Sequence, residues 1–214
     1  MPRILGIDVG LRNLAVCTVD VEEETFQVQQ WAVIDVLQDK KSKQVTIEQS
    51  VSLMLDALGE RPALFEGVEL VAIESQPVGR VVTANVRMKV VSHCIQSFVA
   101  LKTECKCCFV NPKSKLTQEL VRKMCGEQDE EGGDANSKKR YTQHKKMAVA
   151  AVGQMVTTDW TEFWNSLGAK KDDAADALLL ALVAGRPKKK KTRAKKRKRK
   201  EAIEPNNETL EEVI

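Results

Sequence analysis

The sequence predicts an α/β domain built on a mixed five-stranded sheet, and the order of its apolar patterns is the main reason. Three strand-like segments follow one another near the amino terminus with short turns between them, which is typical of an antiparallel meander. Two further apolar runs then alternate with helical patterns, which is typical of parallel strands. The predicted order is three strands, helix, strand, helix, strand and then further helices that flank the sheet.

The strands are predicted where short apolar runs stop at acidic or turn-forming residues. They cover residues 3–7, 14–19, 26–33, 68–73 and 107–110. The first run ends at Asp8. The fourth ends at Glu74 and is a continuous apolar run of the kind that is buried on both faces of a sheet. The fifth stops at Asn111 and Pro112.

Helices are predicted at residues 47–58, 81–101, 116–124, 143–156 and 172–184. The first of these has apolar residues at the three- and four-residue spacing of a helix. The last ends at Gly185, shortly before Pro187, as helices commonly do. Residues 126–136 hold two adjacent glycines and a run of like charges, so they are predicted to be a loop.

Positive charge is concentrated near the carboxyl end of the chain. The whole sequence has 34 basic and 30 acidic residues, a formal net charge of +4. Residues 186–200 hold 12 of the bases and no acid, whereas residues 1–185 hold 22 bases and 25 acids and so carry a net charge of −3. A low-complexity basic run repels itself and cannot bury a core. We therefore expect a folded domain at residues 1–185 and a disordered Lys/Arg-rich tail with an acidic end at residues 186–214.

Composition and cysteine use predict an intracellular protein with no membrane-spanning segment. The chain is 43% hydrophobic and 30% charged, and no apolar run approaches the roughly 20 residues that span a bilayer. The first residues lead directly into a strand-like run and have no signal-peptide pattern. The six cysteines are therefore expected to be reduced, and the cluster Cys105-Lys106-Cys107-Cys108 lacks the second pair that a zinc site needs.

Four acidic residues stand where a sheet can bring side chains together. Asp8 and Glu74 each end an apolar strand, and ligands collect at the carboxyl ends of parallel strands. Asp173 and Asp176 are three residues apart and hence on one face of the last helix, among small alanines that permit close packing. Each acid also has an ordinary explanation when taken alone: a turn residue, a solvated strand end, or a helix amino terminus that favours negative charge.

Four carboxylates at one place repel one another unless cations lie between them. Such oxygen ligands favour magnesium or manganese, and Mg²⁺ keeps water positions open for substrate phosphates. Two such ions roughly 4 Å apart can activate a water and stabilise the leaving oxygen in phosphodiester hydrolysis. The pattern therefore predicts a metal-dependent nuclease.

Three segments in this order resemble the RuvC-type Holliday junction resolvases, which have an RNase H-like fold. The segments read ILGIDVGLRNLA at residues 4–15, VAIESQ at 71–76 and KKDDAADALL at 170–179. The sequence is most similar to the branch found in poxviruses, related large DNA viruses and fungal mitochondria. The resemblance spans residues 3–185 and implies an RNase H-like nuclease domain over residues 1–185.

The resemblance also implies an activity, its cofactor and its metal ligands. It implies an endonuclease that resolves four-way (Holliday) DNA junctions in recombination, repair or viral DNA processing, with two Mg²⁺ ions for which Mn²⁺ substitutes. Branched DNA is then the partner, and a homodimer is expected because two active sites match the twofold symmetry of a junction. The catalytic metal ligands by this resemblance are Asp8, Glu74, Asp173 and Asp176, with Asp172 as the alternative to Asp173.

Basic and aromatic residues complete the predicted site. The family places a basic residue after the fifth strand, near the scissile phosphate, and Lys115 is preferred to Lys113 for this catalytic role. The tail resembles a nuclear localisation signal and also a phosphate-binding arm, which predicts a nucleus or viral replication compartment. The candidates for contact with DNA phosphates are Lys113, Lys138, Lys139, Arg140, Lys145 and Lys146. Trp160, Phe163 and Trp164 are expected to pack in the core rather than to stack on bases.

Three other functions share part of this pattern. Sugar kinases and actin-like ATPases begin with a similar strand, but they need a duplicated domain and a second glycine-containing phosphate loop that this chain lacks. An RNase H-fold nuclease acting on RNA–DNA hybrids or flaps would use the same metals and differ only in substrate shape. A non-catalytic nucleic-acid-binding protein would use the basic tail and would leave the four acids unexplained.

Overall fold

The computed structural model describes residues 1–22, 25–38, 44–76, 83–114 and 137–186. Its centre is a five-stranded sheet with the strand order β3-β2-β1-β4-β5. The strands are β1 (Arg3–Val9), β2 (Asn13–Val21), β3 (Phe26–Asp35), β4 (Leu70–Glu74) and β5 (Lys106–Val110). The first three form an antiparallel meander, and β4 and β5 run parallel to β1. The predicted mixed sheet is confirmed.

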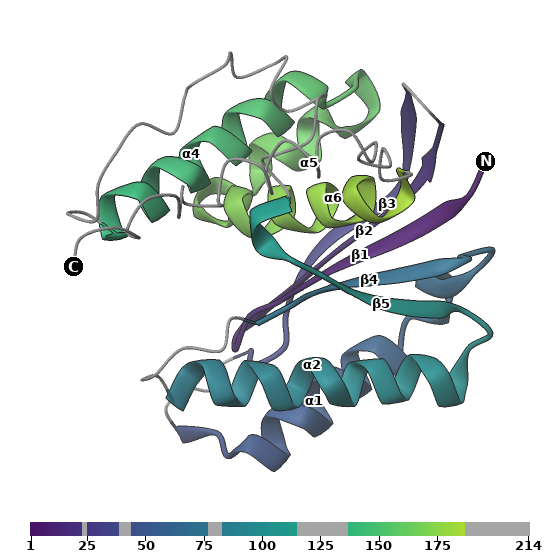
Figure 1. The fold of residues 1–214 in the computed structure, drawn as a ribbon, viewed down its shortest axis with the longest axis vertical. Coiled ribbons are helices and arrows are strands. Elements are labelled where there is room, and N and C mark those ends of the chain that lie inside the picture. The colour runs from purple at the N-terminus through teal and green to yellow at the C-terminus, as the bar shows by residue number, and fades with distance from the viewer. Residues whose placement is uncertain (23–24, 39–43, 77–82, 115–136, 187–214) are drawn as a thin grey trace, which may run out of the picture.

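Helices cover both faces of this sheet, as Figure 1 shows. One face is covered by α1 (Ile47–Gly59) and α2 (Thr83–Lys102). The other face is covered by α4 (Ser137–Met155), α5 (Thr161–Ser166) and α6 (Lys171–Gly185). Strand alternation divides the core accordingly, since Leu5 and Ile7 pack toward α1 and α2 while Ile4 packs in the cluster around α6.

α6 lies so close to β1 that only a glycine fits between their backbones. A Cβ on Gly6 would lie 2.1 Å from the carbonyl oxygen of Ala177 and 2.8 Å from the amide nitrogen of Ala181. Both alanines are fully buried, and no larger side chain on the helix separates its backbone from the strand at this point. The acidic residues of α6 are thereby brought close to those of the sheet.

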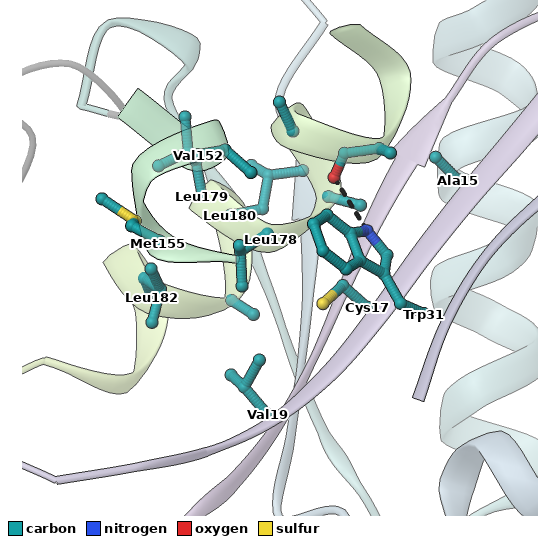
Figure 2. Packing of buried hydrophobic residues seen from close by; sticks show 14 of the residues in the cluster. Ala15, Cys17, Val19, Trp31, Val152, Met155, Leu178, Leu179, Leu180 and Leu182 are labelled. Atoms are coloured by element: carbon teal, nitrogen blue, oxygen red, sulfur yellow. Dashed lines mark hydrogen bonds between the residues drawn. The ribbon is translucent and has the colours of Figure 1, made fainter. Parts of the chain in front are cut away.

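Trp31 of β3 holds the amino-terminal half of α6 against the sheet. Its indole Nε1 donates a hydrogen bond to the carbonyl oxygen of Ala174 at 3.1 Å (Figure 2). Its ring lies against Trp160, Phe163 and Trp164, with ring centroids 5.4–6.1 Å apart. Trp164 is only 7% exposed and the other two are half-buried, so the predicted core role of these three aromatic residues is confirmed.

Some predicted boundaries are wrong. α4 begins at Ser137, six residues before the predicted start, because its first residues have no apolar period although Lys and Arg are good helix formers. β4 begins at Leu70 instead of residue 68. The short α5 was not predicted, since six residues are too few to show a period. The predicted helix at 116–124, the predicted loop at 126–136 and residues 187–214 of the tail lie outside the described residues. Among the described helices, none is both long and apolar enough to cross a bilayer.

Candidate metal centre

Three acidic residues meet at the carboxyl ends of β1 and β4. Asp8, Glu74 and Asp176 each offer one carboxylate oxygen, and these oxygens all lie within 4.8 Å of one another. All three residues are partly exposed. In the described ranges, no other set of three or more possible metal ligands lies so close together.

The register of the sheet accounts for two of these acids. Ile7 pairs with Ile73 across the parallel strands β1 and β4, so Asp8 and Glu74 follow side by side as the next residue on each strand. Both lie on the α6 face of the sheet, because each stands two residues beyond a residue that faces α6, Gly6 in β1 and Ala72 in β4.

The third acid comes from α6. Asp176 immediately precedes Ala177, whose carbonyl oxygen is the atom nearest to a Cβ on Gly6. The close contact between helix and strand therefore sets the height of Asp176 above the sheet. The contact between Gly6 and Ala177, which are 171 positions apart in the sequence, completes the group of three carboxylates.

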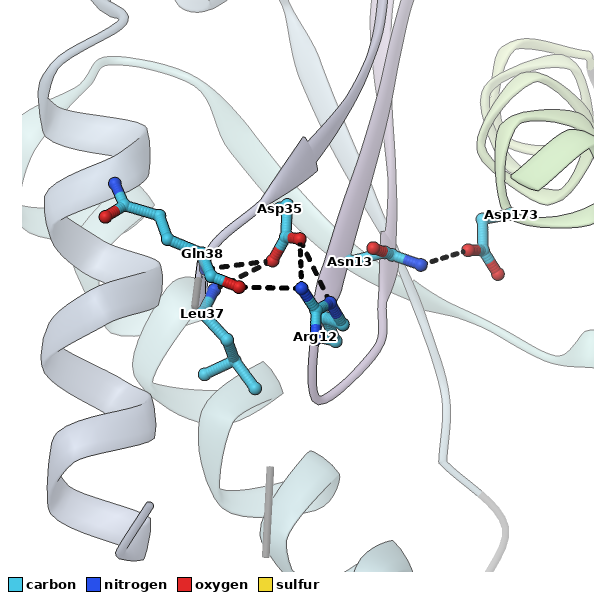
Figure 3. A network of polar contacts seen from close by, with 6 residues as sticks. All are labelled: Arg12, Asn13, Asp35, Leu37, Gln38 and Asp173. Atoms are coloured by element: carbon cyan, nitrogen blue, oxygen red, sulfur yellow. Dashed lines mark hydrogen bonds and ion pairs between the residues drawn. The ribbon is translucent and has the colours of Figure 1, made fainter. Parts of the chain in front are cut away.

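Asp173 lies about one turn before Asp176 and is held by the sheet. Its Oδ2 accepts a hydrogen bond from Asn13 Nδ2 at 2.9 Å (Figure 3). Burial raises the pKa of the Asp173 carboxyl, while the hydrogen bond from Asn13 opposes this shift. Asp172 raises that pKa further, and Lys145 and Lys170 lower it. Asp173 is not one of the three residues that converge within 4.8 Å.

Asp172 and Asp173 have different partners. The Asp172 carboxylate lies 2.5 Å from the Lys145 ammonium of α4, with 36% of the lysine side chain and 25% of the aspartate side chain exposed. Asp172 is thus bound by Lys145 of α4, and Asp173 by Asn13 at the start of β2. Lys145, a predicted DNA contact, is already in an ion pair, whereas Lys146 next to it is exposed.

The remaining predicted site residues are only partly described. Lys115, the preferred basic catalyst, lies outside the described residues. Lys113 belongs to the short turn Pro112–Ser114 beyond β5. Lys138, Lys139 and Arg140 lie in the first turn of α4. The side chains of these last four residues are outside the part of the chain that the structure describes.

Cys17, Cys107 and His93 behave as structural residues. Burial raises the pKa of the Cys107 thiol to about 11, with Cys108 and Cys105 acting in the same direction, so the thiol stays protonated. Cys17 is fully buried. The His93 ring lies tilted against the Phe109 ring with centroids 4.9 Å apart, and His93 Nδ1 lies 2.8 Å from the Lys89 carbonyl oxygen.

The turn between β1 and β2 holds two residues that sequence reasoning missed. Arg12 binds Asp35 through Nε at 3.0 Å and Nη2 at 2.7 Å, and it also donates to the Gln38 carbonyl oxygen (Figure 3). Asn13 binds Asp173. Both belong to the first motif, but an asparagine next to a turn is so common that its type alone signals no further role.

Comparisons with known proteins agree with this fold. The family model described as "Mitochondrial resolvase Ydc2 / RNA splicing MRS1" matches residues 4–60. No curated protein sequence matches the chain at a significant level.

Three solved structures share the fold over 85% of this chain. Yeast mitochondrial Holliday junction resolvase Ydc2 matches with a TM-score of 0.56 and 16% identity, over 77% of its own chain. Thermus thermophilus RuvC in complex with Holliday junction substrate matches with a TM-score of 0.52 and 17% identity, over 91% of its chain. Fowlpox virus resolvase in complex with Holliday junction DNA matches with a TM-score of 0.52 and 16% identity, over 95% of its chain.

At these identities the structural similarity establishes the fold. The family model covers residues 4–60, which include the first strands and the first acid, Asp8. The predicted resemblance is confirmed: this chain has the RNase H-like fold seen in the RuvC-type Holliday junction resolvases, and its residues 4–60 match the Ydc2/MRS1 family model.

Proposed function

We propose that the protein is a structure-specific endonuclease that resolves four-way DNA junctions by metal-dependent hydrolysis of phosphodiester bonds. The observation that carries the proposal is the approach of Asp8, Glu74 and Asp176 to within 4.8 Å. Three carboxylates at this separation repel one another unless a cation is shared between them. Solved structures with the same fold include two resolvases bound to Holliday junction DNA, which supports this choice of substrate.

The donor set fits two Mg²⁺ ions, with Mn²⁺ as a substitute. Carboxylate oxygens are the ligands that both ions prefer. Asp8, Glu74 and Asp176 would hold the ions, with Asp173 as the fourth ligand. Asp172 is the weaker candidate, because Lys145 already neutralises it. When bound, such ions activate a water and neutralise charge on the leaving oxygen.

The basic residues around the site would bind and orient the DNA. Lys115 or Lys113, beyond β5, is proposed to neutralise charge on the scissile phosphate. Lys146, with the basic first turn of α4, is proposed to bind flanking phosphates, which position DNA without reading its sequence. Shape, and not base sequence, should therefore dominate recognition.

A homodimer is proposed to pair two such sites on one junction. α2 offers a surface for it, since Val86 is 59% exposed, Val90 38% and Leu101 81%. At 100° per residue these three positions lie within about 60° of one another around the helix, so they form one apolar stripe.

A non-catalytic RNA-binding role is the second candidate, because the matching family description also names an RNA-splicing protein. Such a protein would have no use for the three converging carboxylates, whose mutual repulsion costs stability. A gel that compares a four-way junction with a flap, an RNA–DNA hybrid and a linear duplex, with and without Mg²⁺, separates the candidates. Equal cleavage of all four substrates would indicate a general nuclease, and binding without cleavage would favour the non-catalytic role.

The direct test replaces the acids without changing their size. Asp8→Asn and Asp176→Asn each remove one negative ligand, so single-turnover cleavage of a four-way junction in Mg²⁺ should fall by at least about 100-fold. Junction affinity measured in Ca²⁺ should be unchanged or higher, because each change removes repulsion between a carboxylate and a phosphate. Asp159→Asn, at an exposed position before α5, is the matched control. Near-normal cleavage by both variants would refute the proposal.

A further inference from the structure

We propose that Asn13 is a positioning residue of the metal centre, whose amide nitrogen holds one oxygen of Asp173 and whose amide oxygen accepts a hydrogen bond from a cation-bound water. The inference rests on the proposed function, because it requires a cation between the acids. It adds a residue from the β1–β2 turn to a site otherwise made of carboxylates.

The orientation of the Asn13 amide follows from the chemistry of its partner. An ionised carboxylate only accepts hydrogen bonds, so the group that faces Asp173 at 2.9 Å must be the amide nitrogen. The Asn13 oxygen must then point elsewhere. That oxygen is buried and has no hydrogen-bond partner among the described residues. Buried acceptors are nearly always satisfied, so a donor that belongs to a ligand of the site is expected here.

The turn holds Asn13 in place from two sides. The Gly10 N–H donates to the Asn13 carbonyl oxygen at 3.0 Å, and a Cβ on Gly10 would lie only 2.8 Å from that oxygen. On the other side, Asn13 pairs with Asp35 of β3, which Arg12 holds through two hydrogen bonds. Asp35 in turn accepts hydrogen bonds from two backbone amides beyond β3 (Figure 3). The amide is therefore presented to α6 by a prearranged backbone.

The hydrogen bond limits how Asp173 can bind a cation. The hydrogen bond from Asn13 occupies Oδ2 of Asp173, which leaves Oδ1 of Asp173 as the oxygen available to a metal. Mg²⁺ and Mn²⁺ accept such single-oxygen binding in six-coordinate sites, whereas Ca²⁺ readily takes both oxygens of a carboxylate. Asn13 should therefore favour the smaller ions over Ca²⁺. Groups of this kind commonly change metal affinity by about 10- to 100-fold.

The test measures metal binding by the full-length protein without DNA. Mn²⁺ affinity is obtained from the electron paramagnetic resonance of free Mn²⁺, and Ca²⁺ affinity from its competition with Mn²⁺. Asn13→Ala should weaken Mn²⁺ binding by about 10-fold or more and Ca²⁺ binding by less, so that the preference shifts toward Ca²⁺. Asn13→Ser, which keeps a turn-forming residue but cannot reach Asp173, should give the same shift. Thermal unfolding of each variant confirms that it is folded.

Asn165→Ala is the matched control, since it removes the same kind of side chain at an exposed position of α5, away from the β1–β2 turn. It should keep the thermal stability and the Mn²⁺ to Ca²⁺ preference of the wild type. Wild-type Mn²⁺ affinity in both Asn13 variants, or an equal shift in Asn165→Ala, would overturn the inference. Asp8→Asn serves as the reference for the site itself. If Asp8→Asn binds Mn²⁺ as the wild type does, the proposed metal centre fails together with the inference.

Discussion

Adjacent aspartates at the start of α6 have different roles because their side chains leave the helix in different directions. Asp172 turns to Lys145 of α4, and Asp173 turns to Asn13 of β2. The sequence alone left open which of the two belongs to the metal site. The ion pair favours Asp173, since Asp172 already has a cationic partner.

The Lys145–Asp172 pair should make a small, salt-sensitive contribution to stability. Lys145→Met should lower the free energy of unfolding by about 1 kcal/mol, since both side chains are partly exposed and solvent screens the pair. Urea titration at low and high salt measures this effect, which should shrink in roughly 1 M salt as the Debye length falls. Lys146→Met at the neighbouring exposed position is the control, and an equal loss there would contradict the assignment.

Arg3 and Asp20 should make part of the stability dependent on pH. The hydrogen bonds from Arg3 lower the pKa of Asp20 against the opposing effect of burial, so its ionised form is favoured in the folded state. A lowered pKa adds stability that is present above the unfolded-state value of about 3.9 and is lost as the pH falls through the folded-state value. Asp20→Asn should cost about 1 kcal/mol at pH 7, after allowance for the partly exposed Arg3, and progressively less below pH 4. Urea unfolding of both proteins across this range would contradict the assignment if the difference stayed constant.

The acids of the candidate site were predictable, and their polar partners were not. Asp8 and Glu74 follow apolar strand runs, and Asp176 has a helical spacing to Asp173, so local patterns point to them. Asn13 and Lys145 act through contacts with residues 160 and 27 positions away. No local pattern in a single sequence specifies such pairs.

The contact between α6 and β1 should tolerate no side chain at residue 6. Gly6→Ala places a methyl group 2.1 Å from a backbone oxygen, so the helix must move away. We expect a loss of about 3 kcal/mol in unfolding free energy, at the upper end of typical overpacking costs, together with weaker Mn²⁺ binding as Asp176 moves.

Gly59→Ala is the control for Gly6→Ala, because nothing lies within 4 Å of a Cβ at the end of α1. It should leave stability unchanged or raise it by up to about 1 kcal/mol. Chemical denaturation and Mn²⁺ titration of the two variants provide the measurement, and a well-tolerated Gly6→Ala would mean that the helix is held less closely than described.

The apolar stripe on α2 leads to a prediction about assembly. Val90→Glu and Leu101→Glu add charge at exposed positions of α2, so the monomer should fold normally while a dimer that buries the stripe should dissociate. Light scattering gives the mass, and paired cutting of a junction embedded in a plasmid gives the functional result. A dimer that persists in both variants would place the interface elsewhere.

At the level of elements, apolar runs and apolar spacing decided which segments could be predicted. The apolar residues of α1 have helical spacing, whereas β4 and α6 are continuous apolar runs. The beginning of α4 is a polar helix turn whose helical state depends on the rest of the helix packing against α6. A pattern in a single sequence carries no information about that packing.

At the level of the whole molecule, the basic tail should contribute to DNA affinity and not to folding. Arg186 is half-buried at the end of α6, so the deletion is best placed after it and removes residues 187–214. The shortened protein should keep its thermal stability and detectable cleavage at low salt, bind junctions more weakly and show a flatter dependence of affinity on salt. An unchanged salt slope would contradict the phosphate-binding proposal, and a fluorescent fusion that loses nuclear accumulation would support a targeting role for the same segment.

Because α6 supplies the third carboxylate of the group, the order in which the chain is synthesised decides when the group is complete. Asp8 and Glu74 are synthesised early, whereas Asp176 follows Glu74 by about 100 residues, which at cellular rates of translation corresponds to about 5–20 s. Throughout this interval the nascent sheet holds only two of the three acids. A partly synthesised chain near nucleic acid therefore lacks the complete group of carboxylates, and on the proposed function it can cut only after the last helix has docked on Gly6.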